Sequence, residues 1–260
     1  MDGYVAALKG VILSIAPAVR IVDISHGISG QDVMEAAYVL QQAIPFFPAG
    51  SIHLAVVDPE VGTQRHSIAF RHKGHLFVGP DSGLFSLLLN GANPEELIQL
   101  DLPQYWRSPN PSPTFHGRDI FAAVAGHLAA GVELSTLGTR TAEMRAMHWA
   151  LPIADRQGLQ GWILHVDSFG NCVSNITEVE FDRWWNGRPF KCYVGNSIVD
   201  KKCNTYAEVA PGEELILFNS GGYLEVALNR GNASSMLDIQ KGTSLNIVFS
   251  ELTEERSINS

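Results

Sequence analysis

One segment organises this chain: Val56-Val57-Asp58-Pro59-Glu60-Val61-Gly62-Thr63-Gln64-Arg65. An apolar run that starts at Ile52 ends abruptly at Asp58, a glycine-containing loop follows, and Arg65 precedes the next apolar run. This pattern predicts a buried strand that ends on a carboxylate, with an arginine on the same loop. In open α/β sheets, ligands bind at the carboxyl ends of the strands. We therefore expect Asp58 and Arg65 to lie at the ligand-binding edge of a sheet.

A second polar segment, Thr114-Phe115-His116-Gly117-Arg118-Asp119, opens a predicted helix. The first turn of a helix has unpaired backbone N–H groups, and its N-terminus disfavours a positive charge, so His116 is expected to stay neutral. We expect His116 to meet Asp58 and Arg65 in space. The alternative is structural: Asp58 and Arg65 form a salt bridge that holds their loop, and His116 packs beside it.

The composition of the 260-residue chain, with 45% hydrophobic and 17% charged residues, is typical of a protein with a substantial core. A net charge of −9 argues against a nonspecific nucleic-acid binder. No apolar run approaches the roughly 20 residues of a membrane span, and Met1-Asp2-Gly3 lacks the basic start of a signal peptide. Cys172, Cys192 and Cys203 show no CxxC spacing, which favours reduced thiols. We expect a soluble, cytoplasmic protein.

The first part of the chain alternates helices with strands. Helices are predicted over residues 4–16, 32–44, 84–89 and 115–130, and strands over 20–24, 52–57, 67–71 and 75–79. The last two strands are expected to form a hairpin that turns at Lys73-Gly74. The alternation predicts an α/β domain over residues 1–154, with a mostly parallel sheet flanked by helices.

The pattern changes after residue 155. Strands are predicted over residues 160–166, 190–194, 214–219, 224–228 and 244–249, separated by turns rich in Gly, Asn, Pro and Ser. We expect a smaller, antiparallel β domain over residues 155–260.

Polar residues cluster in three loops of this second domain. Asp167-Ser168-Phe169-Gly170-Asn171 ends a strand and offers a carboxylate and an amide suited to an amino acid's charged groups. In Asn219-Ser220-Gly221-Gly222-Tyr223, the glycines would let a ligand approach the backbone. The segment Asn229-Arg230-Gly231-Asn232-Ala233 could present backbone polar groups to a purine edge. The alternative for the first two segments is a simple turn.

Other kinds of site are not indicated. None of the nine histidines forms an HxxxH or HxH pair, so no metal site is predicted. The sequence has no GxGxxG or GxxxxGK[ST] phosphate loop and no GxSxG nucleophile elbow.

Taken together, these segments resemble the S-adenosylmethionine (SAM) hydroxide adenosyltransferases, also called adenosine-forming SAM hydrolases, whose relatives are the SAM-dependent fluorinases and chlorinases. The matching segments, in the family's order, are 2–12, 21–26, 56–65, 80–84, 114–121, 167–176 and 223–233. The resemblance implies an N-terminal α/β domain, a C-terminal β domain and a homotrimer that binds SAM at subunit interfaces. SAM would be the substrate, and no cofactor is implied.

The same resemblance assigns roles to residues. It carries the family's water-activating set onto Asp58, Arg65 and His116. The residues implied to hold the methionine end of SAM are Asp167, Asn171 and Ser220, and those implied to meet the adenine are Asn232 and Ala233. In the implied reaction, Asp58 and His116 orient and deprotonate a water, Arg65 stabilises its hydroxide character, and the water attacks ribose C5′ to give adenosine and L-methionine.

Three other functions stay open at this point. The chain could bind SAM or adenosine without catalysis, act as a SAM-dependent halogenase, or hydrolyse another nucleoside with a metal. An anionic Asp58 beside the nucleophile would repel a halide, which favours hydrolysis over halogenation.

The family pattern also differs from this sequence in two places. The family begins with a strand that ends in a Thr-Asp-Phe-Gly type motif, whose aspartate grips the ribose hydroxyls. Because this sequence starts at Met1-Asp2-Gly3, just after that point, the first domain is expected to lack its first strand. Ser82 also stands where an asparagine is common in the family.

Overall fold

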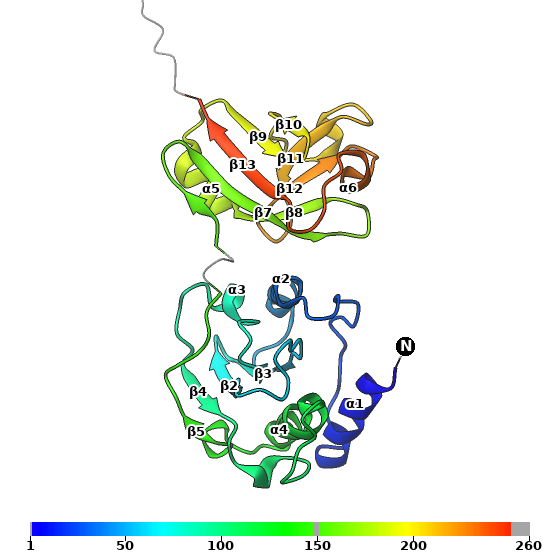
Figure 1. Ribbon diagram of the computed structural model, residues 1–260, viewed down its shortest axis with the longest axis vertical. Coiled ribbons are helices and arrows are strands. Elements are labelled where there is room, and N and C mark those ends of the chain that lie inside the picture. Colours follow the sequence, from blue (N-terminus) through cyan, green and yellow to red (C-terminus); the bar gives the residue numbers. More distant parts are fainter. Residues whose placement is uncertain (1, 148–150, 251–260) are drawn as a thin grey trace, which may run out of the picture. The chain divides into compact units, whose positions relative to one another are not determined.

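The computed structural model describes residues 2–147 and 151–250. The chain divides into two compact units, residues 1–147 and 148–260, each with its own sheet (Figure 1). The expected domain boundary between residues 154 and 155 stays a prediction. Within the described residues, no helix is both long and apolar enough to cross a lipid bilayer.

The described residues of the N-terminal unit form a five-stranded sheet, in the order β1-β3-β2-β4-β5, together with four α-helices. The strands are β1 (Ile52–Leu54), β2 (Ser67–His72), β3 (His75–Pro80), β4 (Glu96–Gln99) and β5 (Thr139–Arg140). The helices are α1 (Tyr4–Ile15), α2 (Val33–Ala43), α3 (Ser86–Leu89) and α4 (Ala122–Ala129). Shorter helical turns are η1 (Ile44–Phe46), η2 (Pro103–Tyr105), the π-helical η3 (Gly117–Phe121) and η4 (Leu134–Thr136).

This sheet is mixed, so the prediction of a mostly parallel sheet is wrong for the residues that the structure describes. Only the β1–β3 pairing is parallel, and the pairings β2–β3, β2–β4 and β4–β5 are antiparallel. The reason is the hairpin β2–β3, which the sequence did predict. Lys73 (φ 48°) and Gly74 (φ 77°) supply the two left-handed residues that a tight hairpin turn requires.

The predicted strand over residues 20–24 does not form. Its alternating apolar pattern fits a pleated, half-buried surface, but a strand also needs a backbone partner, and no described strand pairs with this segment. Val22 and Ile24 are exposed. The segment is tied to α1 by an ion pair between Lys9 Nζ and Asp23 Oδ2, 2.7 Å apart.

Helices α1 and α4 pack against each other beside the sheet (Figure 1). The close approach depends on Gly126, where an added Cβ would lie 3.1 Å from Ile15 Cβ. The core under α4 combines helix and strand residues, including Val124, Val78 and Ile98. The predicted helix over residues 32–44 is confirmed as α2, and the carboxylate of Asp32 caps it.

The C-terminal unit is an eight-stranded sheet whose strand pairings are all antiparallel among the described residues, which confirms the predicted antiparallel β architecture. The order is β10-β9-β13-β7-β8-β12-β11, with β6 on β7. The strands are β6 (Ile153–Ala154), β7 (Gly158–Val166), β8 (Cys172–Thr177), β9 (Phe190–Val194), β10 (Ser197–Val199), β11 (Glu214–Phe218), β12 (Tyr223–Leu228) and β13 (Ser244–Phe249). The helices are α5 (Glu178–Trp185), η6 (Tyr206–Glu208) and α6 (Ala233–Met236).

The core of the C-terminal unit is built around Phe181 of α5, which is fully buried. Its ring contacts those of Phe190, Phe218 and Phe249 from three strands. The helix begins with a reciprocal cap between Thr177 and Glu180. The aromatic cluster therefore anchors α5, a helix that the sequence analysis did not predict.

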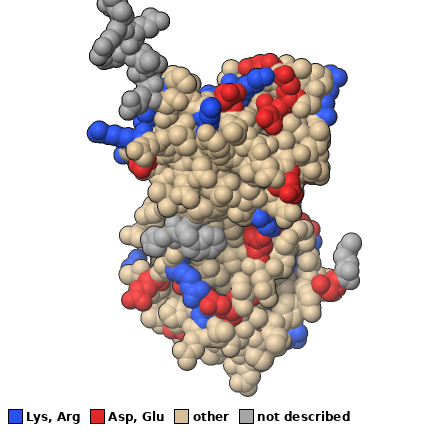
Figure 2. All heavy atoms as spheres, turned by 45° about the horizontal axis from the view of Figure 1, so that its top comes forward, with Lys and Arg blue, Asp and Glu red and all other residues tan. Residues whose placement is uncertain are grey.

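Charged side chains of both signs are interspersed over the face of each unit that Figure 2 presents. A nucleic-acid site is typically a continuous basic surface. The visible face has no such surface, in keeping with the net charge of −9.

His53 of β1 is a buried titratable group in the N-terminal unit. It is 3% exposed, its ring stacks on Phe77 with centroids 5.0 Å apart, and its Nε2 lies 3.1 Å from His75 Nδ1. Burial, and then the neighbouring charge of His75, lower the pKa of His53 to about 4.

The free energy of unfolding should therefore fall in acid. The unfolded chain takes up a proton at His53 near its ordinary pKa of about 6.5, whereas the folded chain does so only near 4. This contribution is complete above pH 6.5 and is lost as the pH falls from 6.5 through 4. When the free energy of unfolding is measured with urea at pH 7 and at pH 4.5, it should fall less in His53→Phe than in the wild type. The two decreases should differ by about 1–3 kcal/mol. An equal loss in both proteins would contradict the assignment.

Candidate functional site

The loop after β1 carries two of the predicted site residues in direct contact. Arg65 Nε donates to both carboxylate oxygens of Asp58 at 3.0 Å, and its Nη2 donates to Asp58 Oδ2. Both side chains are buried, at 1% exposure for Arg65 and 6% for Asp58. Such fork-shaped, charge-assisted contacts fix the orientation of both groups.

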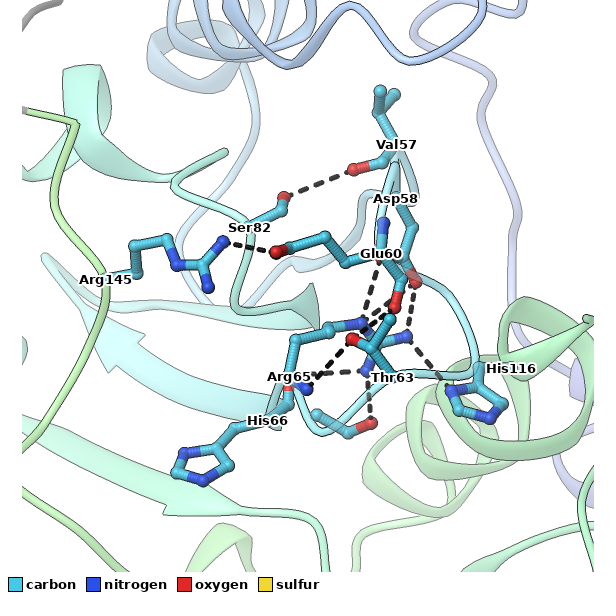
Figure 3. Close-up of polar contacts among 10 residues, drawn as sticks. Val57, Asp58, Glu60, Thr63, Arg65, His66, Ser82, His116 and Arg145 are labelled. Atoms are coloured by element: carbon cyan, nitrogen blue, oxygen red, sulfur yellow. Dashed lines mark hydrogen bonds and ion pairs between the residues drawn. The ribbon is translucent and has the colours of Figure 1, made fainter. Parts of the chain in front are cut away.

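His116 joins this pair from another part of the chain. Its Nδ1 lies 3.0 Å from Arg65 Nη2, so the structure brings Asp58, Arg65 and His116 together (Figure 3). A guanidinium has only N–H donors, so His116 Nδ1 must accept, and a neutral imidazole then carries its proton on Nε2. Burial, and next the charge of Arg65, lower the pKa of His116 against the opposing pull of Asp58. The site therefore holds a neutral His116 that presents an N–H at Nε2.

Arg65 uses its remaining donors on the protein as well. Nη1 donates to Ser67 Oγ at 2.9 Å and to the carbonyl oxygen of His66 at 3.4 Å. The guanidinium also lies 5.2 Å from the centroid of the Phe121 ring. Because a guanidinium has five N–H groups and all five have protein acceptors, Arg65 acts here as the organiser of the other two side chains.

The loop that carries Asp58 and Arg65 is held on two sides. The carbonyl oxygen of Val57 accepts from Ser82 Oγ at 3.2 Å, and Glu60 forms an ion pair with Arg145 (Figure 3). At Gly62, φ is +80°, and an added Cβ would lie 2.4 Å from the carbonyl oxygen of Pro113. Glycine is thus required where this loop meets the segment leading to His116.

Asp119 anchors the segment that positions His116, which caps the π-helical turn η3. The Asp119 carboxylate is 2% exposed and accepts from Arg118 Nε and Nη2 at 2.7 Å and from the backbone N–H of Ser112 at 2.9 Å. The hydrogen bond from Arg118 is the main reason that the pKa of Asp119 falls to about 2. The sequence predicts a helix here but not the π turn or this anchor, although the Arg118-Asp119 pair beside His116 is a usable signal.

In the C-terminal unit, the Asp167 carboxylate organises its own loop. It accepts from the backbone N–H groups of Phe169 and Asn171 at 2.8 and 2.9 Å, and from Asn171 Nδ2 at 3.0 Å. Asn171 is buried, whereas Phe169 is 76% exposed. The sequence-predicted pair Asp167 and Asn171 therefore lies together at the end of β7.

Asn232 and Ala233 begin α6 next to the same loop. Asn232 Oδ1 accepts from the N–H of Ser235 at 2.8 Å, and Ala233 is fully buried. An added Cβ at Gly170 would lie 2.1 Å from Asn232 Cγ, so the two segments touch. Ser220 is exposed on the separate β11–β12 turn. Within the C-terminal unit, four of the five predicted binding residues thus share two contacting segments.

Metal ligands and thiols were the other candidate reactive groups in the part of the chain that the structure describes. Among the described residues, no group of three or more His, Cys, Asp or Glu is arranged to hold a metal ion. The three cysteines are free and buried, and burial raises the pKa of Cys172 and Cys192 to about 12. Thiols of this kind are poor nucleophiles.

Comparison with known proteins identifies one family, whose two domain models both match this chain. Models of the SAM hydroxide adenosyltransferase N-terminal and C-terminal domains match residues 1–138 and 161–246. A protein named (R)-S-adenosyl-L-methionine hydrolase from Thermus thermophilus is 36% identical over 93% of this chain and 92% of its own length. A fluorinase from Actinoplanes is 26% identical over 95% and 93%. The crystal structure of an uncharacterized conserved protein from Thermotoga maritima superposes with a TM-score of 0.85 at 32% identity, covering 95% of each chain.

The packing at Gly62 predicts a specific loss of function. Gly62→Ala and Gly91→Ala both place a side chain at positive φ, 80° and 78°, which costs about 1 kcal/mol. Of these two positions, a Cβ at Gly62 would lie against a backbone oxygen, whereas nothing lies within 4 Å of a Cβ at Gly91. We expect Gly62→Ala to lower turnover at least tenfold by shifting Arg65 away from His116, and Gly91→Ala to retain wild-type turnover. Equal turnover in the two variants, both folded by circular dichroism, would contradict this role.

Proposed function

Because the chain belongs to the SAM hydroxide adenosyltransferase family, we propose that it hydrolyses S-adenosyl-L-methionine to adenosine and L-methionine. The observation that carries the proposal is the buried contact set that Asp58 and Arg65, on the loop after β1, make with His116. The 36% identity to a SAM hydrolase, against 26% to a fluorinase, favours water over halide as the nucleophile.

The reaction needs a positioned nucleophile more than an acid. The oxygen of water attacks ribose C5′, the electron pair of the C5′–S bond passes to sulfur, and methionine leaves as a neutral thioether. One proton of the water is released. Because the leaving group is neutral, no general acid is required on its side. The protein's task is to hold a water in line behind C5′, and such positioning can contribute on the order of 7–11 kcal/mol in ideal cases.

The hydrogen bonds around Arg65 give the three side chains different parts in this proposal. His116 accepts from Arg65 at Nδ1, so its Nε2–H can donate to the oxygen of the water. The Asp58 carboxylate accepts from the Nε–H and Nη2–H of Arg65 and from the backbone N–H of Glu60 at 3.3 Å. Three N–H groups leave one of its roughly four acceptor sites, where it would accept the proton. Arg65 holds both groups in place, and its positive charge favours hydroxide character in the water.

The proposal extends to how SAM is held. Asp167, Asn171 and Ser220 would bind the methionine end, and Asn232 and Ala233 would meet the adenine. The family resemblance supports these roles, and so does the contact between the Asp167 loop and the start of α6. We further propose a homotrimer with SAM at subunit interfaces, SAM as substrate with no cofactor, and no nucleic-acid or membrane partner. The three free cysteines fit a reducing cytoplasm.

Incubating the purified protein with SAM, without halide, tests the function. Adenosine and methionine should appear in equal amounts, both with and without EDTA, and added chloride or fluoride should give no 5′-halogenated adenosine. SAM that remains intact would support a binding protein instead, and loss of turnover in EDTA would support a metal-dependent hydrolase.

Variants in the same assay test the assigned residues. Asp58→Asn and His116→Ala should lower kcat by about 10²–10⁴-fold, because each removes one of the groups that position or deprotonate the water. Binding of SAM, measured by calorimetry, should persist in both variants. Gln64→Ala, an exposed change on the same loop, serves as the matched control and should keep wild-type turnover. Unchanged kcat in Asp58→Asn would remove Asp58 from the mechanism.

A further inference from the structure

Glu225 of β12 is a buried carboxyl group that the proposed reaction leaves unused. It is 3% exposed, and its Oε1 accepts from the hydroxyl of Tyr206 at 2.7 Å. Burial is the main reason that the pKa of Glu225 is raised, and the charge of Asp167 adds to the effect. Burying a carboxyl group costs free energy. Packing in the core therefore does not by itself explain why a glutamate occupies this position.

Glu225 is connected to the turn that carries Ser220. Asn219 Oδ1 accepts from the backbone N–H groups of Gly221 and Tyr223 at 3.0 and 3.2 Å, so the oxygen of this amide is committed to the turn. The Asn219 side chain also hydrogen-bonds Glu225, and its NH2 group is the only donor left for that contact. Glu225 thereby fixes the orientation of the amide that shapes the turn around Ser220.

Glu225 also shares its surroundings with the Asp167 loop. In the pairing of β12 with β8, Glu225 lies opposite Val173 and Val226 lies opposite Cys172, the residue that follows Asn171 of that loop. Burial first, and then the charges of Asp167 and Glu225, raise the pKa of Cys172. Tyr206 is 41% exposed, so this group of polar side chains lies close to the surface of the unit. Two carboxylates near one exposed turn create a negative potential that favours a cation.

We propose that Glu225 is a positioning and specificity-determining residue for the amino-acid end of SAM. Through Asn219 it sets the turn that carries Ser220, and its charge adds to that of Asp167 in selecting the α-ammonium group. The inference rests on the proposed function, and it assigns Glu225 to substrate selection and not to the attack on C5′.

The test separates the charge of Glu225 from its hydrogen bonds. A glutamine at this position keeps both contacts, because its oxygen can accept from the Asn219 amide and its NH2 group can donate to the Tyr206 hydroxyl, which both donates and accepts. Glu225→Gln therefore removes the charge while keeping the turn. Tyr206→Phe does the reverse: it keeps the charge and removes one hydrogen bond to Glu225.

Steady-state kinetics are measured with SAM and with its analogue that lacks the α-amino group. Relative to the wild type, Glu225→Gln should raise KM for SAM about tenfold, with kcat within about threefold, because a nearby charge no longer attracts the ammonium group, whereas Tyr206→Phe should leave KM within about threefold. KM for the analogue should not change. Glu213→Gln, at an exposed ion pair with Lys201 in the same unit, should match the wild type with both substrates.

Two results would overturn the inference while leaving the proposed function intact. One is an unchanged KM for SAM in Glu225→Gln. The other is an equal rise in KM for both substrates, which is what a merely structural role predicts. If the wild type releases no adenosine from SAM, the proposed function is itself overturned, and the role of Glu225 with it.

Discussion

The guanidinium of Arg65 is the contact on which the candidate site depends. Its fixed planar set of five N–H groups binds the Asp58 carboxylate on one side and His116 Nδ1 on the other. Two protein segments, 51 positions apart in the chain, are thereby held in one geometry. A lysine offers three donors on a flexible stem and could not impose this arrangement on both partners.

The surrounding fold keeps these contacts in register. Gly62 lets the Asp58 loop approach Pro113, and Asp119 ties the segment before His116 to the π-helical turn. A π turn widens the helix at the point where a side chain must be aimed, which is why such turns recur at functional sites. The precision of the site therefore comes from backbone features on both sides of Arg65 and not from its three side chains alone.

The sequence was informative where local chemistry decides the structure. The Asp58 and Arg65 pair on a post-strand loop, the Lys73-Gly74 hairpin and the Asp32 cap of α2 each follow from short patterns, and the structure contains all three. The sequence is misleading where pairing between distant segments determines whether a strand forms and in which direction it runs. No strand among the described residues pairs with the apolar segment 20–24. The hairpin reverses strand directions that the alternation of helices and strands suggests are parallel. Roles such as those of Asp119 and Glu225 depend on tertiary contacts that spacing does not encode.

Attack of water on ribose C5′ is the central claim, and an isotope label tests it most directly. SAM is incubated with the protein in water enriched in ¹⁸O, and both products are analysed by mass spectrometry. The mechanism predicts one ¹⁸O atom in the 5′-hydroxyl of adenosine and none in methionine, because the C5′–S bond breaks on the ribose side of sulfur. Unlabelled adenosine, or label in the methionine product, would contradict it.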